Sequence, residues 1–199
     1  DDYDLAEVFP YINPTMLYVR HLGFRGRFLE LLDAGDVKAL ELRSHVKEVE
    51  EIMLARPDIR AKTVYKFFRS ASDGDDVVIL SPNGKKEIER FRFGRQESGD
   101  GLCLADYLQT IESGVADYVA LFVTTVGPGI RELAEEWKSD GNFLKSHILQ
   151  LLALEGAEGF AELIHERIRA MWGIGERVAL NKEDLFKTRY QGRRFSFGY

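Results

Sequence analysis

Two strand-like runs joined by a turn, near the middle of the chain, restrict the possible fold more than any other feature. Residues 76–80 read Asp-Val-Val-Ile-Leu, residues 87–93 alternate charged and apolar side chains, and Pro82-Asn83-Gly84 lies between them. An Asn-Gly turn between strand-like runs is a strong signal for a β-hairpin. The β-branched and aromatic run 63–69 precedes both, across the turn-forming residues 72–75. Together the three runs predict an antiparallel meander.

Helix-forming patterns lie on both sides of this meander. The segments predicted to be helical are residues 4–7, a run that begins at Asn13-Pro14, residues 36–56, residues 104–111, a run from Ile130, a long helix over about 142–172, and a short run after Asn181. The apolar run 117–126 predicts a further strand, covered on both faces. Because helices and strands follow one another in blocks, the sequence predicts an α+β fold. Its antiparallel sheet is flanked by helices that include one long C-terminal helix.

Composition excludes several classes of protein. The chain has 199 residues, with 27 basic and 33 acidic side chains, a formal net charge of −6 and one cysteine. An acidic chain with interspersed charges lacks the basic footprint of a nucleic-acid-binding protein. One cysteine cannot form an internal disulfide, and no apolar run reaches the roughly 20 residues of a membrane-spanning helix. We therefore expect a cytoplasmic protein with no nucleic-acid or membrane partner.

Three partial motifs do not carry the chemistry that they suggest. Gly127-Pro128-Gly129 has Glu132 where a dinucleotide fingerprint needs its third glycine. His165-Glu166 begins like a zinc-protease helix, but Arg169 stands where the second histidine is required. Cys103 lies between leucines, which favours a buried, inert thiol over a nucleophile. We predict no catalytic residue and no metal ligand.

The long helix carries Glu158, Glu162 and Glu166, which recur every four residues and so share one face. One interpretation is a solvated acidic face relieved by Arg167 and Arg169. The other is that one of the carboxylates faces a bound cation.

Gly156 and Gly159 lie within the same helix. A glycine inside a helix costs about 1 kcal/mol relative to alanine. Two of them therefore predict close packing of another element against the helix, or a bend.

The C-terminal residues 193–199 read Arg-Arg-Phe-Ser-Phe-Gly-Tyr. If the segment is extended, Arg194, Ser196 and Gly198 share one side and the aromatic rings share the other. One interpretation is purely structural: an edge strand with a buried aromatic face. In the alternative, the arginine fork, the hydroxyl and the glycine hold a carboxylate-bearing ligand against the backbone.

Residues 190–199, Tyr-Gln-Gly-Arg-Arg-Phe-Ser-Phe-Gly-Tyr, closely resemble the Tyr-Gln-Gly-x-Arg-x-x-x-Gly-Tyr signature of the activation domain of cobalamin-dependent methionine synthase. The segments that resemble other parts of this family, in the same order, are 11–13, 74–76, 102–107, 116–124 and 157–169 with Trp172-Gly173. The resemblance spans nearly the whole chain, residues 1–199. It implies a helmet-like α+β domain built around a twisted antiparallel sheet.

The resemblance also implies a function. Domains of this family bind S-adenosylmethionine and support the reductive methylation of inactive cob(II)alamin to methylcobalamin, with an electron from a flavodoxin or a similar reductase. The parent enzyme transfers a methyl group from methyltetrahydrofolate to homocysteine. The implied partners are the cobalamin-binding domain of the same polypeptide and the reductase, and the implied location is the cytoplasm.

Carried over residue by residue, the resemblance implies an S-adenosylmethionine site. Arg194 would hold the ligand carboxylate, Ser196 would offer backbone groups, and Gly198-Tyr199 would lie beside the adenosine. Glu158 would face the sulfonium or ammonium group. Asn13 would contact the ligand amine with an amide in place of the aspartate that is usual in the family.

The chain departs from the family at a second position. Thr188 stands where an acidic residue is usual, so the site would be less negative. This leaves open a second hypothesis: a docking cap for a cobalamin domain and a reductase, or a reactivation protein for another corrinoid enzyme, with weak S-adenosylmethionine binding.

Signals for the other domains of the enzyme are missing. There is no Asp-x-His-x-x-Gly motif for cobalt ligation and no cysteine cluster for zinc. The chain also opens on Asp1 and stops at Tyr199, inside the signature. We therefore expect a fragment that lacks the C-terminal part of the domain, with the cobalamin, folate and homocysteine domains, and their cobalamin and zinc, elsewhere in the enzyme.

Overall fold

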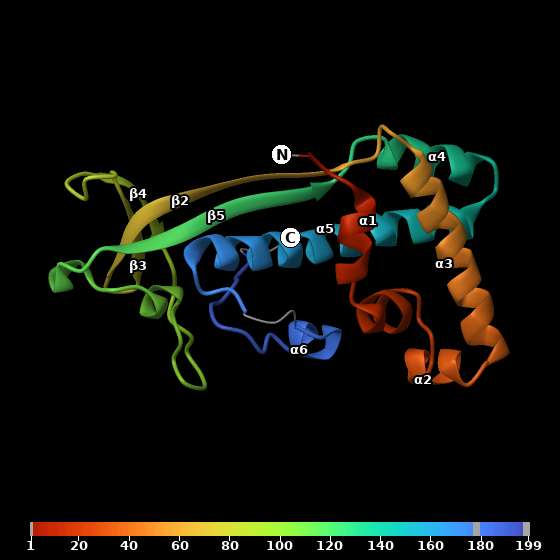
Figure 1. Ribbon diagram of the computed structural model, residues 1–199, viewed down its shortest axis with the longest axis horizontal. Coiled ribbons are helices and arrows are strands. Elements are labelled where there is room, and N and C mark those ends of the chain that lie inside the picture. Colours follow the sequence, from red (N-terminus) through yellow and green to blue (C-terminus); the bar gives the residue numbers. More distant parts are fainter. Residues whose placement is uncertain (1, 177–179, 197–199) are drawn as a thin grey trace. The chain divides into compact units, whose positions relative to one another are not determined.

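The computed structural model describes residues 2–176 and 180–196. The chain divides into two compact units, of which unit 1 comprises residues 1–63 and 123–199 and unit 2 comprises residues 64–122. Figure 1 shows the helices and strands of both units. Each unit is described by itself.

A five-stranded sheet contains the predicted meander. Its strands are β1 (Asp2–Tyr3), β2 (Ala61–Asp73), β3 (Asp76–Leu80), β4 (Glu87–Arg92) and β5 (Asp117–Val126). The order is β1-β2-β3-β4, and β5 pairs with β2. The β3–β4 hairpin is confirmed, since the two strands are antiparallel with Asp76 opposite Arg92 and Leu80 opposite Glu87. The turn between β2 and β3 is tighter than predicted, because Asp73 already pairs with Asp76 and Gly74 takes a φ of 60°.

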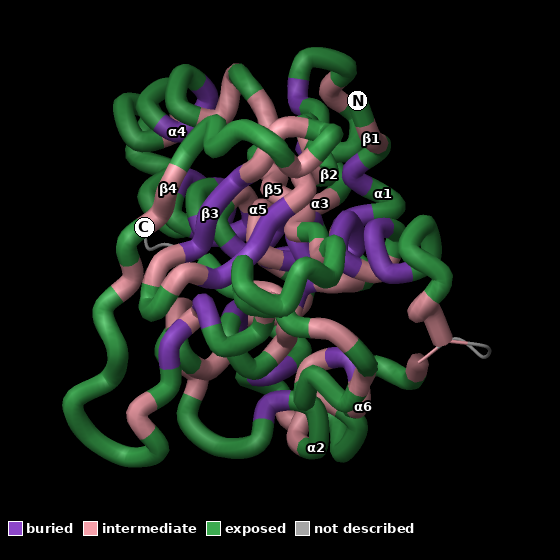
Figure 2. Tube along the Cα trace, turned by 90° about the vertical axis from the view of Figure 1, so that its left-hand side faces the viewer, coloured by how far each residue is buried: buried purple, intermediate pink, exposed green. Residues whose placement is uncertain are grey.

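The core of unit 2 lies against this hairpin. Its buried members are Val77, Ile79, Cys103 and Ala105, packed against the partly buried Phe68, Phe91, Phe93, Leu108 and Val119. The Cys103 thiol is buried, as predicted, and donates to the Asp75 carbonyl oxygen at 3.4 Å. The predicted helix over 104–111 is instead two 3-10 turns, Leu104–Tyr107 and Ile111–Ser113. In Figure 2 the middle of β3 is drawn as buried.

Strand β5 has the predicted bounds but not the predicted burial. Tyr118 is 46% exposed and Val123 is 65% exposed, so the expectation of cover on both faces is wrong. An unbroken apolar run is typical of a strand in a buried parallel sheet. In a sheet of antiparallel pairs one face can remain open, and the pattern of this strand did not distinguish the two cases.

Unit 1 is built around α5, which runs from Phe143 to Trp172 as predicted. The helix begins after Asn142 and ends at Gly173, whose φ of 80° is the left-handed conformation that stops helices. The other helices of this unit are α1 (Leu5–Val8), a 3-10 turn (Phe9–Tyr11), a π-helix (Thr15–His21), α2 (Phe28–Asp33), α3 (Val37–Ala55), α4 (Ile130–Ser139) and α6 (Lys182–Phe186). The predicted start of α3 is confirmed, since the Asp36 side chain caps it by accepting from the Ala39 amide at 3.0 Å.

The two glycines of α5 are points of close approach, which confirms one of the two predictions made for them. A Cβ at Gly156 would lie 3.1 Å from Val126 Cγ2 at the end of β5. A Cβ at Gly159 would lie 2.9 Å from the carbonyl carbon of Tyr11. Gly159 therefore lets the segment that leads into Asn13 pack directly onto the helix.

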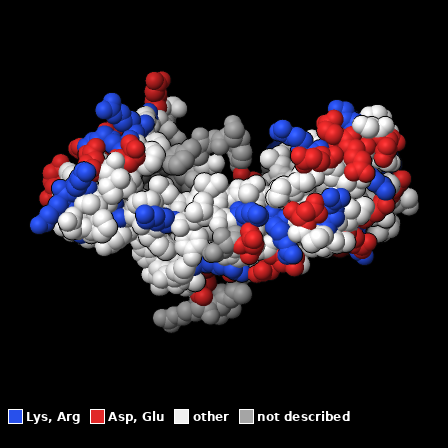
Figure 3. Space-filling view, turned by 90° about the horizontal axis from the view of Figure 1, so that it is seen from above, with Lys and Arg blue, Asp and Glu red and all other residues white. Residues whose placement is uncertain are grey.

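The α+β class, with an antiparallel sheet, flanking helices and one long helix, is confirmed. Within residues 2–176 and 180–196, no helix combines the length and the apolarity needed to cross a membrane. On the face drawn in Figure 3, Lys and Arg lie among Asp and Glu, and uncharged residues make up much of the rest.

Candidate functional site

Glu158, Glu162 and Glu166 of α5 do not form a solvated acidic face. Glu162 is 7% exposed, and the side chain of Glu158 is 35% exposed. Glu166 accepts a hydrogen bond from the Tyr11 hydroxyl at 2.9 Å. The expectation fails because segments that are distant in sequence cover this face, which helical periodicity cannot reveal.

Glu162 is the central group of this face. Its Oε2 accepts the Tyr190 hydroxyl at 3.1 Å and lies 3.4 Å from Arg194 Nη2. Burial alone would raise the pKa of this carboxyl, but the neighbouring His165, Arg194 and Tyr190 together lower it below its usual value. Burial and the charge of Glu162 raise the pKa of Tyr190 to about 12. At neutral pH the carboxylate is therefore ionised and the phenol remains a donor.

Arg169 lies beside Glu162 and is 1% exposed. Its Nη1 donates to His165 Nδ1 at 3.0 Å, and its Nη2 donates to Glu176 Oε2 at 2.9 Å. Since arginine can only donate, Nδ1 of His165 is the acceptor in this contact. The guanidinium stacks over the Tyr190 ring at 3.9 Å. Glu162 thus faces a cation of the chain itself, the guanidinium of Arg169.

Arg194 reaches the same face from the C-terminal segment. Its Nη1 lies 3.7 Å from Glu158 Oε2, and its side chain is 22% exposed. Its Nε is buried and has no hydrogen-bond partner among the described residues. Residues 193–196 belong to no strand and Phe195 is 45% exposed, so the interpretation as an edge strand with a buried aromatic face is wrong for this part of the segment.

The N-terminal segment approaches α5 one residue beyond Glu158. Tyr11 packs at Gly159, and the Lys182 ammonium lies 4.1 Å from the centre of the Tyr11 ring. Asn13 follows two residues later, and its Oδ1 accepts from the Thr15 amide at 3.0 Å. That oxygen is therefore already engaged at the start of the π-helix.

The structure brings together part of the predicted site. Arg194 and Glu158 face each other, and the segment that carries Asn13 packs beside Glu158. Ser196 is exposed. Gly198 and Tyr199 lie outside the described residues. The roles predicted for these residues in ligand binding remain predictions.

Sequence reasoning overlooked Glu162, Tyr190 and Arg169 as parts of the site. Glu162 was visible as a member of the glutamate row, and Tyr190 as the first residue of the signature. Nothing in the sequence showed that one carboxylate joins them, because their hydrogen bond spans 28 residues.

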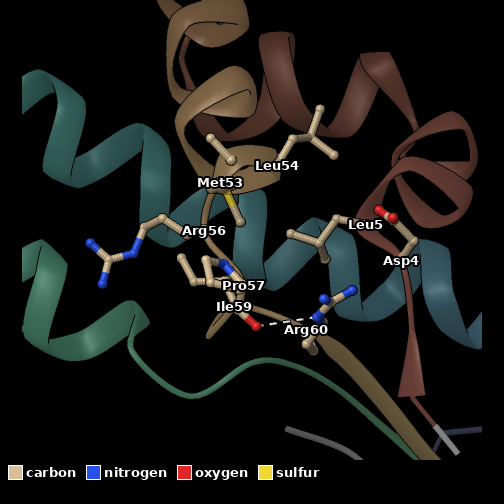
Figure 4. Close-up of a pocket in the computed structure, with 9 residues that line it drawn as sticks. Asp4, Leu5, Met53, Leu54, Arg56, Pro57, Ile59 and Arg60 are labelled. Carbon is tan, nitrogen blue, oxygen red and sulfur yellow. Dashed lines mark hydrogen bonds between the residues drawn. The ribbon is translucent and has the colours of Figure 1, made fainter.

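A separate pocket of about 160 Å³ lies in unit 1 between α1, the end of α3 and the start of β2 (Figure 4). Its guanidinium groups are already engaged. Arg56 pairs with Asp58 at 2.8 Å, and Arg60 Nε donates to the Pro57 carbonyl oxygen at 3.2 Å. Of the predicted site residues that the structure describes, none lines it.

In the described part of the chain, no three His, Cys, Asp or Glu side chains lie close enough together to hold an ion.

Comparison with known proteins assigns the family. Residues 4–199 match the family described as vitamin B12 dependent methionine synthase, activation domain. The chain belongs to this family. Methionine synthase of Mycobacterium tuberculosis (strain ATCC 25618 / H37Rv) is 32% identical over 151 residues. This match covers 70% of the chain and 13% of the mycobacterial enzyme, so the chain spans about an eighth of the length of this relative.

A solved structure of the same family has the same fold. The crystal structure of the MetH reactivation domain bound to AdoHcy superposes with a TM-score of 0.89 at 26% identity. It covers 100% of the chain, which in turn covers 63% of the solved protein. The resemblance of the signature to the activation domain is therefore confirmed at the level of the family and of the fold.

Proposed function

We propose that the chain binds S-adenosylmethionine and acts as the reactivation module of a cobalamin-dependent methionine synthase. The observation that carries the proposal is the placement of Arg194, a residue of the family signature, beside Glu158. The solved relative was crystallised with AdoHcy, the product that remains when S-adenosylmethionine has given up its methyl group.

The charges of the site fit this ligand. A carboxylate of the ligand can accept from a guanidinium edge, and the buried Nε of Arg194 is a donor that lacks an acceptor among the described residues. S-adenosylmethionine also carries an ammonium and a sulfonium group. Glu158 favours these cations, because opposite charges a few ångströms apart attract in a partly buried site. Ser196, Gly198 and Tyr199 complete the proposed site as backbone and adenosine contacts.

In this proposal the chain is one module, residues 1–199, of a longer methyltransferase. The cobalamin-binding domain of the same polypeptide and a flavodoxin or a similar reductase are its partners, and cobalamin and zinc belong to other domains. S-adenosylmethionine supplies the methyl group, while the residues of this module hold and orient its amino-acid part. The buried free thiol of Cys103 supports a cytoplasmic location.

Calorimetric titration of the full-length protein with S-adenosylmethionine tests the proposal. Arg194→Ala should weaken binding by about a hundredfold, since a charged hydrogen bond that leaves an unpaired group costs a few kcal/mol. Arg193→Ala is the matched control: it removes the same charge one residue away, from an exposed side chain. No saturable binding, or equal losses in the two variants, would refute the ligand assignment.

A second candidate function is a docking cap for a cobalamin domain and a reductase with weak ligand binding. It is favoured by Asn13, whose neutral side chain already accepts a hydrogen bond from the Thr15 amide at the start of the π-helix. Asn13→Asp keeps a capping oxygen and adds a charge. If the reactivation module is correct, this variant should bind S-adenosylmethionine more tightly than the wild type. A wild type that binds no ligand but still forms the complex with reductase would support the cap.

A further inference from the structure

Glu162 holds two residues of the signature with one oxygen. Its Oε2 accepts from the Tyr190 hydroxyl at 3.1 Å and from Arg194 Nη2 at 3.4 Å. Tyr190 and Arg194 are separated by a loop that contains Gly192, whose φ is 93°. Two anchors on one carboxylate therefore fix both ends of this loop.

Two further side chains of α5 lie near the other oxygen of this carboxylate. Oε1 of Glu162 lies 3.8 Å from Arg169 Nη1 and 3.8 Å from His165 Nδ1. Arg169 in turn packs against the loop at two points. Its guanidinium stacks on the Tyr190 ring at 3.9 Å, and a Cβ at Gly192 would lie 3.4 Å from Arg169 Cδ. The loop thus rests on a buried polar layer built from three side chains of one helix.

This arrangement sets the direction of the Arg194 guanidinium before any ligand arrives. Only Nη2 bonds to Glu162, and the bond of 3.4 Å is long. Nε has no partner among the described residues, so it is available to an acceptor from the ligand. A guanidinium that is already oriented loses less conformational freedom on binding than a free arginine side chain, which raises affinity without a new ligand contact.

We propose that Glu162 is a positioning residue, which sets the orientation of Arg194 for the carboxylate of an amino-acid-bearing nucleoside ligand. The proposal rests on the proposed function. Glu162 does not touch the ligand in this scheme, and its effect passes through Arg194 and Tyr190. It should therefore appear with ligands that carry a carboxylate and vanish with those that lack one.

The test compares two ligands on the full-length protein, with binding measured by ligand-detected NMR and by calorimetry. S-adenosylhomocysteine carries the amino-acid carboxylate, whereas 5′-methylthioadenosine has the nucleoside and the sulfur without it. Glu162→Gln keeps the shape of the side chain and removes its charge. We expect this variant to weaken the binding of S-adenosylhomocysteine about tenfold or more, and to change the affinity for 5′-methylthioadenosine less than twofold. Tyr190→Phe, which removes one hydrogen bond, should weaken the binding of S-adenosylhomocysteine about threefold.

Glu50→Gln is the matched control. Glu50 is a half-buried carboxylate of α3 that accepts from Arg43 at 2.9 Å, so its loss also breaks an ion pair of unit 1. This variant should bind both ligands as the wild type does. Equal losses for both ligands in Glu162→Gln would show a merely structural role, and unchanged or tighter binding of S-adenosylhomocysteine would show that Glu162 competes for Arg194. Either result overturns the positioning role.

The two proposals fail in distinguishable ways. If wild-type protein binds neither ligand, the proposed function fails. If the wild type binds and Arg194→Ala loses affinity while Glu162→Gln does not, only the positioning role fails.

Discussion

The contact between Gly159 and Tyr11 allows a sharp test of how the N-terminal segment is held on α5. In the variant Gly159→Ala, the added methyl carbon would meet three backbone atoms: Tyr11 C at 2.9 Å, Tyr11 O at 3.0 Å and Ile12 N at 3.0 Å. Backbone atoms cannot turn aside as a side chain can. Alanine is about 1 kcal/mol better than glycine inside a helix, and overpacking costs about 1–3 kcal/mol. We expect a net loss of about 1–2 kcal/mol in the free energy of unfolding.

Gly156→Ala is the matched control for this variant. It lies three residues earlier in the same helix and gains the same helix propensity, but its methyl carbon would meet only the Val126 side chain, at 3.1 Å from Cγ2. A valine side chain can shift, so the free energy of unfolding should stay within about 0.5 kcal/mol of the wild type.

Urea unfolding at 25 °C, followed by helical ellipticity and with the slopes compared, measures both values. The binding assay adds an independent measurement, because a displaced Tyr11–Asn13 segment should also weaken the binding of S-adenosylmethionine. If Gly159→Ala is as stable as Gly156→Ala, the segment does not rest on the helix as described and the reasoning fails.

Three further predictions concern stability. Thr188→Asn should raise the free energy of unfolding by about 1 kcal/mol, because a β-branched residue at a φ of 51° is strained and asparagine tolerates that region; no gain in urea midpoint would contradict this. Glu162→Gln should be destabilising by about 1–3 kcal/mol at pH 7, and the loss should shrink as the pH falls below the unfolded pKa of the Glu162 carboxyl. The pKa of the Glu162 carboxyl is lowered in the fold. Its contribution to the free energy of unfolding is therefore present above the unfolded pKa and is lost as the pH falls through the folded pKa. A loss of stability that does not change with pH would refute this. Asp36→Ala removes the cap of α3 and should cost about 1 kcal/mol in thermal or urea unfolding, unless another group caps the helix.

Local signals were sufficient for the hairpin and for α5. An Asn-Gly turn, alternating side chains and a terminal glycine act on near neighbours, so the bounds of β3, β4 and α5 could be predicted from short windows of sequence. The same reasoning failed for Glu162 and Val123, since their burial depends on which segments cover them. Helical spacing shows that Glu158 and Glu162 share a face, but not that Arg194 lies over it.

The site was predictable in the same uneven way. The resemblance to the family identified Arg194 and Glu158, and the structure places them 3.7 Å apart. Neither spacing nor composition could show that Tyr190 is tied to the helix by a hydrogen bond across 28 residues. A buried polar contact of this kind follows from the tertiary fold.

The burial of Cys103 gives unit 2 its own chemical reporter. It is the only cysteine of the chain, and it lies in the core against β3, so a thiol reagent can modify it only when that core opens. Both tryptophans, Trp137 of α4 and Trp172 of α5, belong to unit 1. Labelling kinetics and tryptophan fluorescence therefore follow the opening of the two units separately in the unmodified protein, without an engineered probe.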